Sequence, residues 1–235
     1  MLGVVATLAI GATALGGSPA VAATTRPARV DPATVVAVLK GAYDIYKSFI
    51  GGGSSGAAAT AQIIAAINSA RTDIINHIDA VATAQAKACA QDAVIEFADF
   101  EALTPDNKQG FAINATQCVT LIDSLTTAVS DKAAVDQLGF ALNSVGPIAL
   151  TARARTGLSN PGLVTTLRHA NTQVQGVLVP TCHTVTIERH TEWVCNSYNG
   201  DQFGPDVPLV VVQAKAGQRT SWAVAVAVLP TLNTL

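Results

Sequence analysis

Residues 57–103 decide the fold of this chain; they read AAATAQIIAAINSARTDIINHIDAVATAQAKACAQDAVIEFADFEAL, without glycine or proline. Apolar residues recur along this stretch at close to a 3.5-residue period, which is typical of amphipathic and coiled-coil helices. The apolar positions are Ile63, Ile64, Ile67, Ile74, Ile78, Val81, Ala84, Ala88, Ile95 and Ala102. We predict one long helix with coiled-coil character, which would extend for about 70 Å if it were continuous.

The chain is predicted to turn back at Thr104-Pro105, because threonine is a favoured helix N-cap and proline a favoured first helical residue. A second helix would then run antiparallel to the first. Cys89 and Cys118 lie almost equally far from Thr104 along the chain, so their side chains come to nearly the same height. We predict a Cys89–Cys118 disulfide that stabilises this hairpin by roughly 3–4 kcal/mol.

Further helices are predicted on both sides of the hairpin. Asp31-Pro32 opens a first helix, and the Gly/Ser-rich residues 51–56 form a flexible connector after it. Ser130-Asp131 and Asn160-Pro161 start two later helices, and Pro180 ends the helical part. The chain is therefore predicted to be mainly α, an antiparallel bundle with one long helix hairpin.

The pattern changes after Pro180, where valine and threonine become frequent and the apolar period becomes two, as in strands. The predicted strands cover residues 184–187, 193–197, 209–214 and 222–229. Cys182 and Cys195 bracket the first two, so we predict a hairpin pinned by a Cys182–Cys195 disulfide. This small β element would occupy residues 180–235, beside a bundle formed by residues 57–179.

The N-terminal part is predicted to direct export. Residues 2–15 form an uncharged apolar run, and Ala20-Val21-Ala22 supplies the small-residue cleavage site of a secretory signal peptide. The run is shorter than the roughly 20 residues of a membrane span. We expect residues 1–22 to be a signal peptide, residues 23–56 to hold the first helix and its linker, and the protein to be secreted. The alternative is a buried N-terminal helix.

Charge and motifs exclude several classes of function. The chain has 14 Lys and Arg against 16 Asp and Glu, without a block of like charge, so we expect no nucleic-acid partner. It contains no G-x-S-x-G, no phosphate-binding glycine loop and no H-E-x-x-H zinc signature. Two disulfides would also leave none of the four cysteines with a free thiol that could act as a nucleophile. We therefore assign no catalytic residue and no cofactor, and favour a protein that is not an enzyme.

One cluster could supply zinc ligands, because His183, Glu188, His190 and Glu192 lie close together in the sequence. Along one continuous strand Glu188, His190 and Glu192 would share a face, and His183 would point to the other. A solvated polar surface explains the same residues. A secreted metal-dependent hydrolase built on this cluster is therefore one alternative function.

Trp193, Tyr198 and Trp222 are candidates for a ligand surface, because all three fall in the predicted β element of a chain that has few aromatic residues, and aromatic side chains are frequent anchors of contacts. Packing in the core explains them as well. The leading hypothesis is a secreted, non-enzymatic interaction module that binds an extracellular protein or glycan.

The other alternative is a membrane-active protein that binds lipid. The segment around Ile63, Ile64 and Ile67 is apolar on nearly all sides, which is typical of a central bundle helix or of a helix that enters a membrane. Long, weakly charged helices behind a glycine-rich hinge are similar in arrangement to those of helical pore-forming toxins, although no motif is shared.

Overall fold

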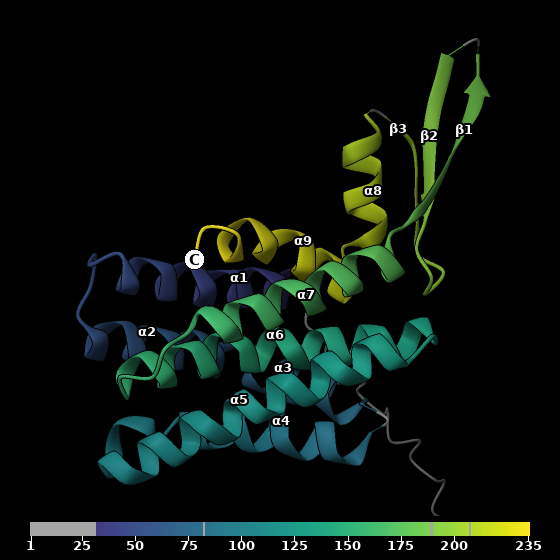
Figure 1. Ribbon diagram of the computed structural model, residues 1–235. Coiled ribbons are helices and arrows are strands. Elements are labelled where there is room, and N and C mark those ends of the chain that lie inside the picture. Colours follow the sequence, from purple (N-terminus) through teal and green to yellow (C-terminus); the bar gives the residue numbers. More distant parts are fainter. Residues whose placement is uncertain (1–31, 82, 189, 207) are drawn as a thin grey trace, which may run out of the picture.

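The computed structural model describes residues 32–81, 83–188, 190–206 and 208–235 (Figure 1). The helices are α1 (Pro32–Ile50), α2 (Gly56–Ser69), α3 (Arg71–Asp79), α4 (Ala84–Phe97), the 3₁₀ turn η1 (Phe100–Ala102), α5 (Pro105–Ala128), α6 (Lys132–Arg155), α7 (Pro161–Leu178), α8 (Leu209–Gly217) and α9 (Ser221–Leu232). The strands are β1 (Thr181–Ile187), β2 (His190–Asn196) and β3 (Gln202–Asp206). The predicted fold class, a helical bundle with a small disulfide-pinned β element, is confirmed. The predicted signal peptide, residues 1–22, lies outside the described residues.

The centre of the bundle is α6, which is buried without interruption from Leu138 to Ala152. Three polar side chains in this run, Asn143, Ser144 and Thr151, each donate to the carbonyl oxygen four residues earlier, over 2.9, 2.8 and 2.7 Å. A buried polar group without a partner is strongly destabilising, so these local bonds allow the helix to be enclosed on all sides. The helices α1, α3, α4, α5, α7 and α9 surround it.

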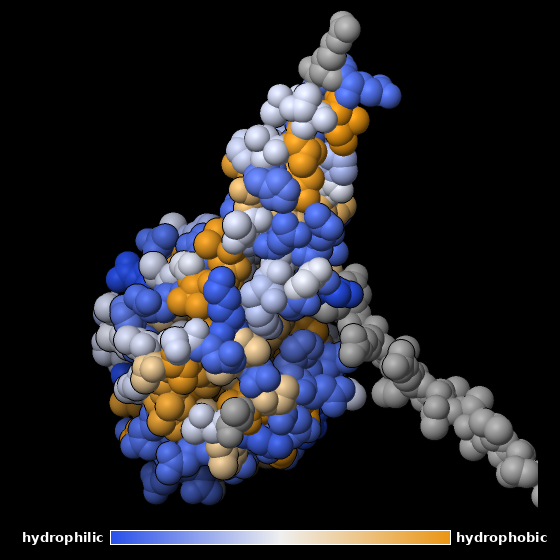
Figure 2. All heavy atoms as spheres, turned by 90° about the vertical axis from the view of Figure 1, so that its right-hand side faces the viewer, coloured by the Kyte–Doolittle hydropathy of each residue, from blue (hydrophilic) through white to orange (hydrophobic). Residues whose placement is uncertain are grey.

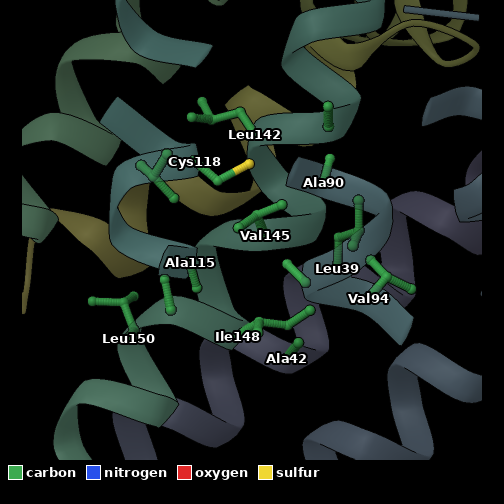
Figure 3. Packing of buried hydrophobic residues seen from close by; sticks show 14 of the residues in the cluster. Leu39, Ala42, Ala90, Val94, Ala115, Cys118, Leu142, Val145, Ile148 and Leu150 are labelled. Atoms are coloured by element: carbon green, nitrogen blue, oxygen red, sulfur yellow. The ribbon is translucent and has the colours of Figure 1, made fainter. Parts of the chain in front are cut away.

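Apolar side chains from three of these helices meet α6 in one continuous core (Figure 3). The labelled residues are Leu39 and Ala42 of α1, Ala90 and Val94 of α4, Ala115 and Cys118 of α5, and Leu142, Val145, Ile148 and Leu150 of α6. Burial of such side chains is the main favourable term in folding. The bundle is therefore held together around α6 rather than around a two-helix seam.

The prediction of one continuous helix over residues 57–103 is wrong, and the predicted coiled coil is not confirmed. Ala70 leaves the helical region (φ −116°, ψ 14°) between α2 and α3, and Thr83 is extended before α4. The 24-residue α6 is about 36 Å long. A straight helix of twice that length would leave much of its apolar stripe uncovered, whereas the bends let α2, α3 and α4 each contact α6.

The predicted hairpin at Thr104 is confirmed in α4 and α5. The Thr104 hydroxyl accepts from the backbone N–H of Asn107 and caps α5. Cys89 and Cys118 are joined in a disulfide with their Cα atoms 5.6 Å apart. Buried alanines on both helices, such as Ala90 and Ala115, let the backbones approach this closely.

The predicted strands at 209–214 and 222–229 are wrong, because both segments are helical, in α8 and α9. In α9 the buried side chains include Ser221, Val224, Ala225, Val228 and Leu232, which follow a helical spacing of three and four. Alternating Ala and Val satisfies this pattern as well as a strand pattern. The helix packs against α1, α6 and α7, and so it completes the bundle.

The described strands form one antiparallel sheet in the order β1-β2-β3. The predicted Cys182–Cys195 disulfide is present and joins directly opposed residues of β1 and β2. β3 was not predicted, because Gly204-Pro205 in its middle is usually a turn signal. Gly204 has a φ of 117°, and a Cβ at this position would collide with the backbone oxygen of Trp193, so only glycine fits beside β2.

A projecting arm as the candidate binding site

Residues 181–217, which comprise the sheet and α8, form an arm that stands out from the bundle (Figure 1). One face of the sheet packs on α8, where Cys195, Val212 and Ala216 are buried and Trp193 and Phe203 cover them. The Cys182–Cys195 disulfide lies in this small core. The arm therefore has its own packing, which holds its shape outside the main core.

Asp136 of α6 joins the base of the arm and the start of α9 to the central helix of the bundle. The hydroxyl of Tyr198, just after β2, donates to Asp136 Oδ2 over 2.7 Å, and the backbone N–H of Ser221 donates to Oδ1 over 2.5 Å. Burial raises the pKa of Asp136, although both hydrogen bonds act in the opposite direction. The same burial and the neighbouring Asp136 raise the pKa of the Tyr198 phenol.

A second link joins the turn after β2 to the segment between α8 and α9. The guanidinium of Arg219 donates from Nε to Asp201 Oδ2 over 2.8 Å. This bond holds the pKa of Asp201 below its ordinary range. Because the pair is largely at the surface, we expect it to orient the turn more than to stabilise the fold.

The outer part of the arm exposes aliphatic side chains. Leu209, Val210 and Val211 open α8 and are 36%, 68% and 41% exposed, and Ile187 at the end of β1 is 42% exposed. Figure 2 shows hydrophobic side chains along the arm above the bundle. Adjacent exposed apolar residues on a protruding element are typical of an interaction surface. The sequence signal for this surface is the apolar run after Pro208, which fits a strand pattern as well as a helix pattern.

The predicted metal cluster is spread along the hairpin. Direct pairing of His183 with Val194, of Val185 with Glu192 and of Ile187 with His190 places both histidines and Glu192 on one face. The expectation that His183 points to the other face is wrong, because the chain reverses between Ile187 and His190. Glu188 lies in this turn, with a φ of 48°. Within the described part of the chain, no three His, Cys, Asp or Glu residues are placed to hold a metal ion.

The three aromatic residues of the predicted ligand surface have separate environments. Trp193 is half-buried against α8, and Tyr198 is occupied by its bond to Asp136. Trp222 is buried with Val135, Val174 and other residues where the arm meets the bundle. They therefore do not form one exposed aromatic surface.

The segment predicted to enter lipid lies in the folded core. Ile63 and Ile67 are buried in α2, and the half-buried Ile64 packs against the same cluster. None of the described helices combines the length and the apolar character needed to cross a bilayer. Insertion of this segment would first require α2 to separate from α1 and α6.

A groove of about 440 Å³ runs between α4 and α5 beside the Cys89–Cys118 disulfide. Phe111 and Leu121 supply apolar lining, and Asp92 and Glu96 supply acidic lining. Sequence reasoning did not indicate this groove, because it depends on the relative placement of two helix faces. Comparison of the chain with family models, with curated proteins and with solved structures finds no match.

Proposed function

We propose that this protein is an exported, non-enzymatic interaction protein whose arm binds an extracellular protein partner. The observation that carries this proposal is the adjacent exposure of Leu209, Val210 and Val211 on a projecting element that has its own packed core. Covering such side chains with a partner is favourable by roughly 25 cal/mol for each Å² of apolar surface that is removed from water. A partner that covered them would gain this free energy without having to order the arm first.

Export is supported by two features that do not depend on the exposed residues of α8. The apolar run at 2–15 with its Ala-Val-Ala site is typical of a signal peptide. Both pairs of cysteines form disulfides, and disulfides persist mainly in oxidising compartments outside the cytosol.

A protein partner is favoured over a glycan by the chemistry of the exposed residues. Aliphatic side chains suit the apolar centre of a protein interface, whereas a sugar ring presents many hydroxyl groups and is bound best against an exposed aromatic face. Trp193 and Trp222 are turned into packing instead. The exposed surface of α8 is therefore better matched to an apolar patch on another protein.

Site-specific photo-crosslinking tests this proposal. A photoreactive residue replaces Val210 in the full disulfide-bonded chain, which is applied to the surface and medium of the producing cells. We expect discrete protein adducts whose yield falls about tenfold or more when Val211→Asp is also present, the loss that corresponds to about 1.4 kcal/mol. The matched control carries the same residue at Ile113, which is 44% exposed on α5. Identical adducts from both positions, or adducts with lipid alone, would contradict the proposal.

A further inference from the structure

The strand β1 forms an open edge of the sheet. β2 pairs with it on one side, α8 contacts part of one face, and no other element of the described chain makes a substantial contact with it. Figure 1 shows it on the outer side of the arm, away from the bundle. The opposite edge of the sheet differs, because β3 contains Pro205 and packs against α8.

The register shows which backbone groups face outward from β1. Ile187 and His190 close the hairpin around a two-residue turn, and this closing pair is of the hydrogen-bonded kind. Pairs alternate along the strands, so Cys182 and Cys195 form a non-hydrogen-bonded pair. Their Cα separation of 4.0 Å fits the closer spacing of such pairs.

The backbone N–H and C=O groups of Cys182, Thr184 and Thr186 therefore point away from β2. Within the described part of the chain, these groups make no backbone hydrogen bond to another element. β1 also contains no Lys, Arg, Asp, Glu or Pro, the residues that normally protect an edge strand from pairing. The edge is thus both unpaired and unprotected.

We propose that β1 pairs antiparallel with β1 of a second copy of this chain, centred on Thr184. The outward-facing residues Cys182 and Thr186 lie at equal distances along the chain on either side of Thr184. Thr184 then opposes Thr184 of the second copy, and Cys182 opposes Thr186 on either side. Each of these pairs exchanges two backbone hydrogen bonds, so every outward-facing group is satisfied. No charged side chain of β1 is brought against a like charge.

The same register covers apolar side chains at both ends of the strand. Ile187 of one copy comes opposite Thr181 of the second copy. It therefore lies next to Val179 of that second copy, two residues before β1. Val179 and Ile187 are 43% and 42% exposed in the single chain. The two-fold axis repeats this contact at the other end. Because the strands are antiparallel, the second bundle lies beyond the tip of the first arm.

This pairing is independent of the proposed partner, because it uses the edge of β1 rather than the exposed residues at the start of α8. Sedimentation velocity of the full disulfide-bonded chain from micromolar to near-millimolar concentration tests it. We expect a reversible dimer. Thr184→Pro removes an outward N–H without breaking a bond to β2, and should weaken dimerisation about tenfold or more, whereas Thr184→Val should retain it. A chain that stays monomeric throughout would overturn the proposal.

Cysteine crosslinking tests the register itself. Opposed residues of a hydrogen-bonded pair have Cα atoms about 5.5 Å apart, within the range of a disulfide. Thr184→Cys should therefore join two copies under mild oxidation, with both native disulfides confirmed by peptide mapping. Ile187→Cys is the matched control, because this exposed position lies far from its own symmetry mate. Equal crosslinking from both variants, or none from Thr184→Cys, would contradict the pairing.

Discussion

The hydroxyl of Tyr198 donates to Asp136 over 2.7 Å, and through this bond the base of the arm is joined to the central helix of the bundle. The other oxygen of Asp136 accepts from the first backbone N–H of α9, at Ser221. One partly buried carboxylate therefore positions both the turn after β2 and the start of the last helix. It also receives the partial positive charge of that helix N-terminus, which favours an anion.

Removing the Tyr198 hydroxyl should weaken this junction. We expect Tyr198→Phe to lower the free energy of unfolding by about 1.5–3 kcal/mol at neutral pH, because a hydrogen bond to an ionised group is lost in a mostly buried site. Urea unfolding measures the loss, and amide exchange should show the largest gain in the turn after β2. Unchanged stability together with unchanged exchange would mean that the bond does not anchor the arm.

Asp136 should give the stability of the protein a distinct pH dependence. Its pKa in the folded state is raised by burial, so the folded state holds a proton that the unfolded state has released. The stabilising contribution is fully present below the ordinary carboxyl pKa of about 4, and it is lost as the pH rises through the raised value.

The variant Asp136→Asn isolates this contribution, because the amide does not titrate. Unfolding free energies of both proteins are measured by urea titration from pH 3 to neutral, about the range in which carboxyl groups titrate. We expect the advantage of the wild-type protein over the variant to shrink as the pH rises. A constant difference would show that the pKa of Asp136 is not raised. Asp44 and Asp201, whose pKa values are lowered, titrate equally in both proteins.

Gly146 of α6 should not tolerate a side chain. A Cβ at this position would collide with the hydroxyl of Tyr43, which donates to Asn143 in the core over 3.3 Å. We expect Gly146→Ala to destabilise the protein by about 1–3 kcal/mol through overpacking. Adding Tyr43→Phe should recover part of this loss by removing the colliding oxygen.

The matched control for that substitution is Gly176→Ala in α7, where a Cβ would meet no atom within 4 Å. Alanine is the better helix former, so this variant should gain about 0.5–1 kcal/mol. Thermal and urea unfolding of both variants check the pair. Equal effects of the same sign would show that contact with Tyr43 does not decide the outcome at Gly146.

The two disulfides should stabilise different parts of the molecule. Cys89–Cys118 spans 29 residues and joins two bundle helices, so its replacement by a pair of alanines should lower the free energy of unfolding by about 3–4 kcal/mol. Replacing Cys182 and Cys195 should leave unfolding of the bundle nearly unchanged and increase amide exchange in β1 and β2. A larger loss of bundle stability from the second replacement would contradict the separate packing of the arm.

Much of the helical framework could be predicted from local signals. Thr104-Pro105 and Asn160-Pro161 mark the starts of α5 and α7, with proline at the first helical position of both and a Thr104 side-chain cap on α5. The height match of Cys89 and Cys118 follows from helix geometry, and the disulfide forms although α4 ends at Phe97 and the 3₁₀ turn η1 precedes Thr104. The second disulfide was predictable on a different ground, because Cys182 and Cys195 bracket the two strands of the predicted hairpin.

The errors arose where tertiary packing chose between equally good local patterns. Nothing at Ala70 signals a bend, because the bend is imposed by the length of α6. The Ala/Val run in α9 fits a strand or a helix, and the position left open beside α1, α6 and α7 selects the helix. At the candidate site the sequence identified the hairpin. It did not give the anchoring role of Asp136, which lies some sixty residues away in the chain from Tyr198.

The path of the chain through the arm has a consequence for how such a protein can change. The arm begins directly after α7 and ends shortly before α9, and these two helices pack against each other. It is therefore an insertion at a single junction of the bundle. Segments placed in this way can be lengthened, replaced or removed without rerouting the core. The bundle can therefore keep its core while residues 181–217 are lengthened or exchanged.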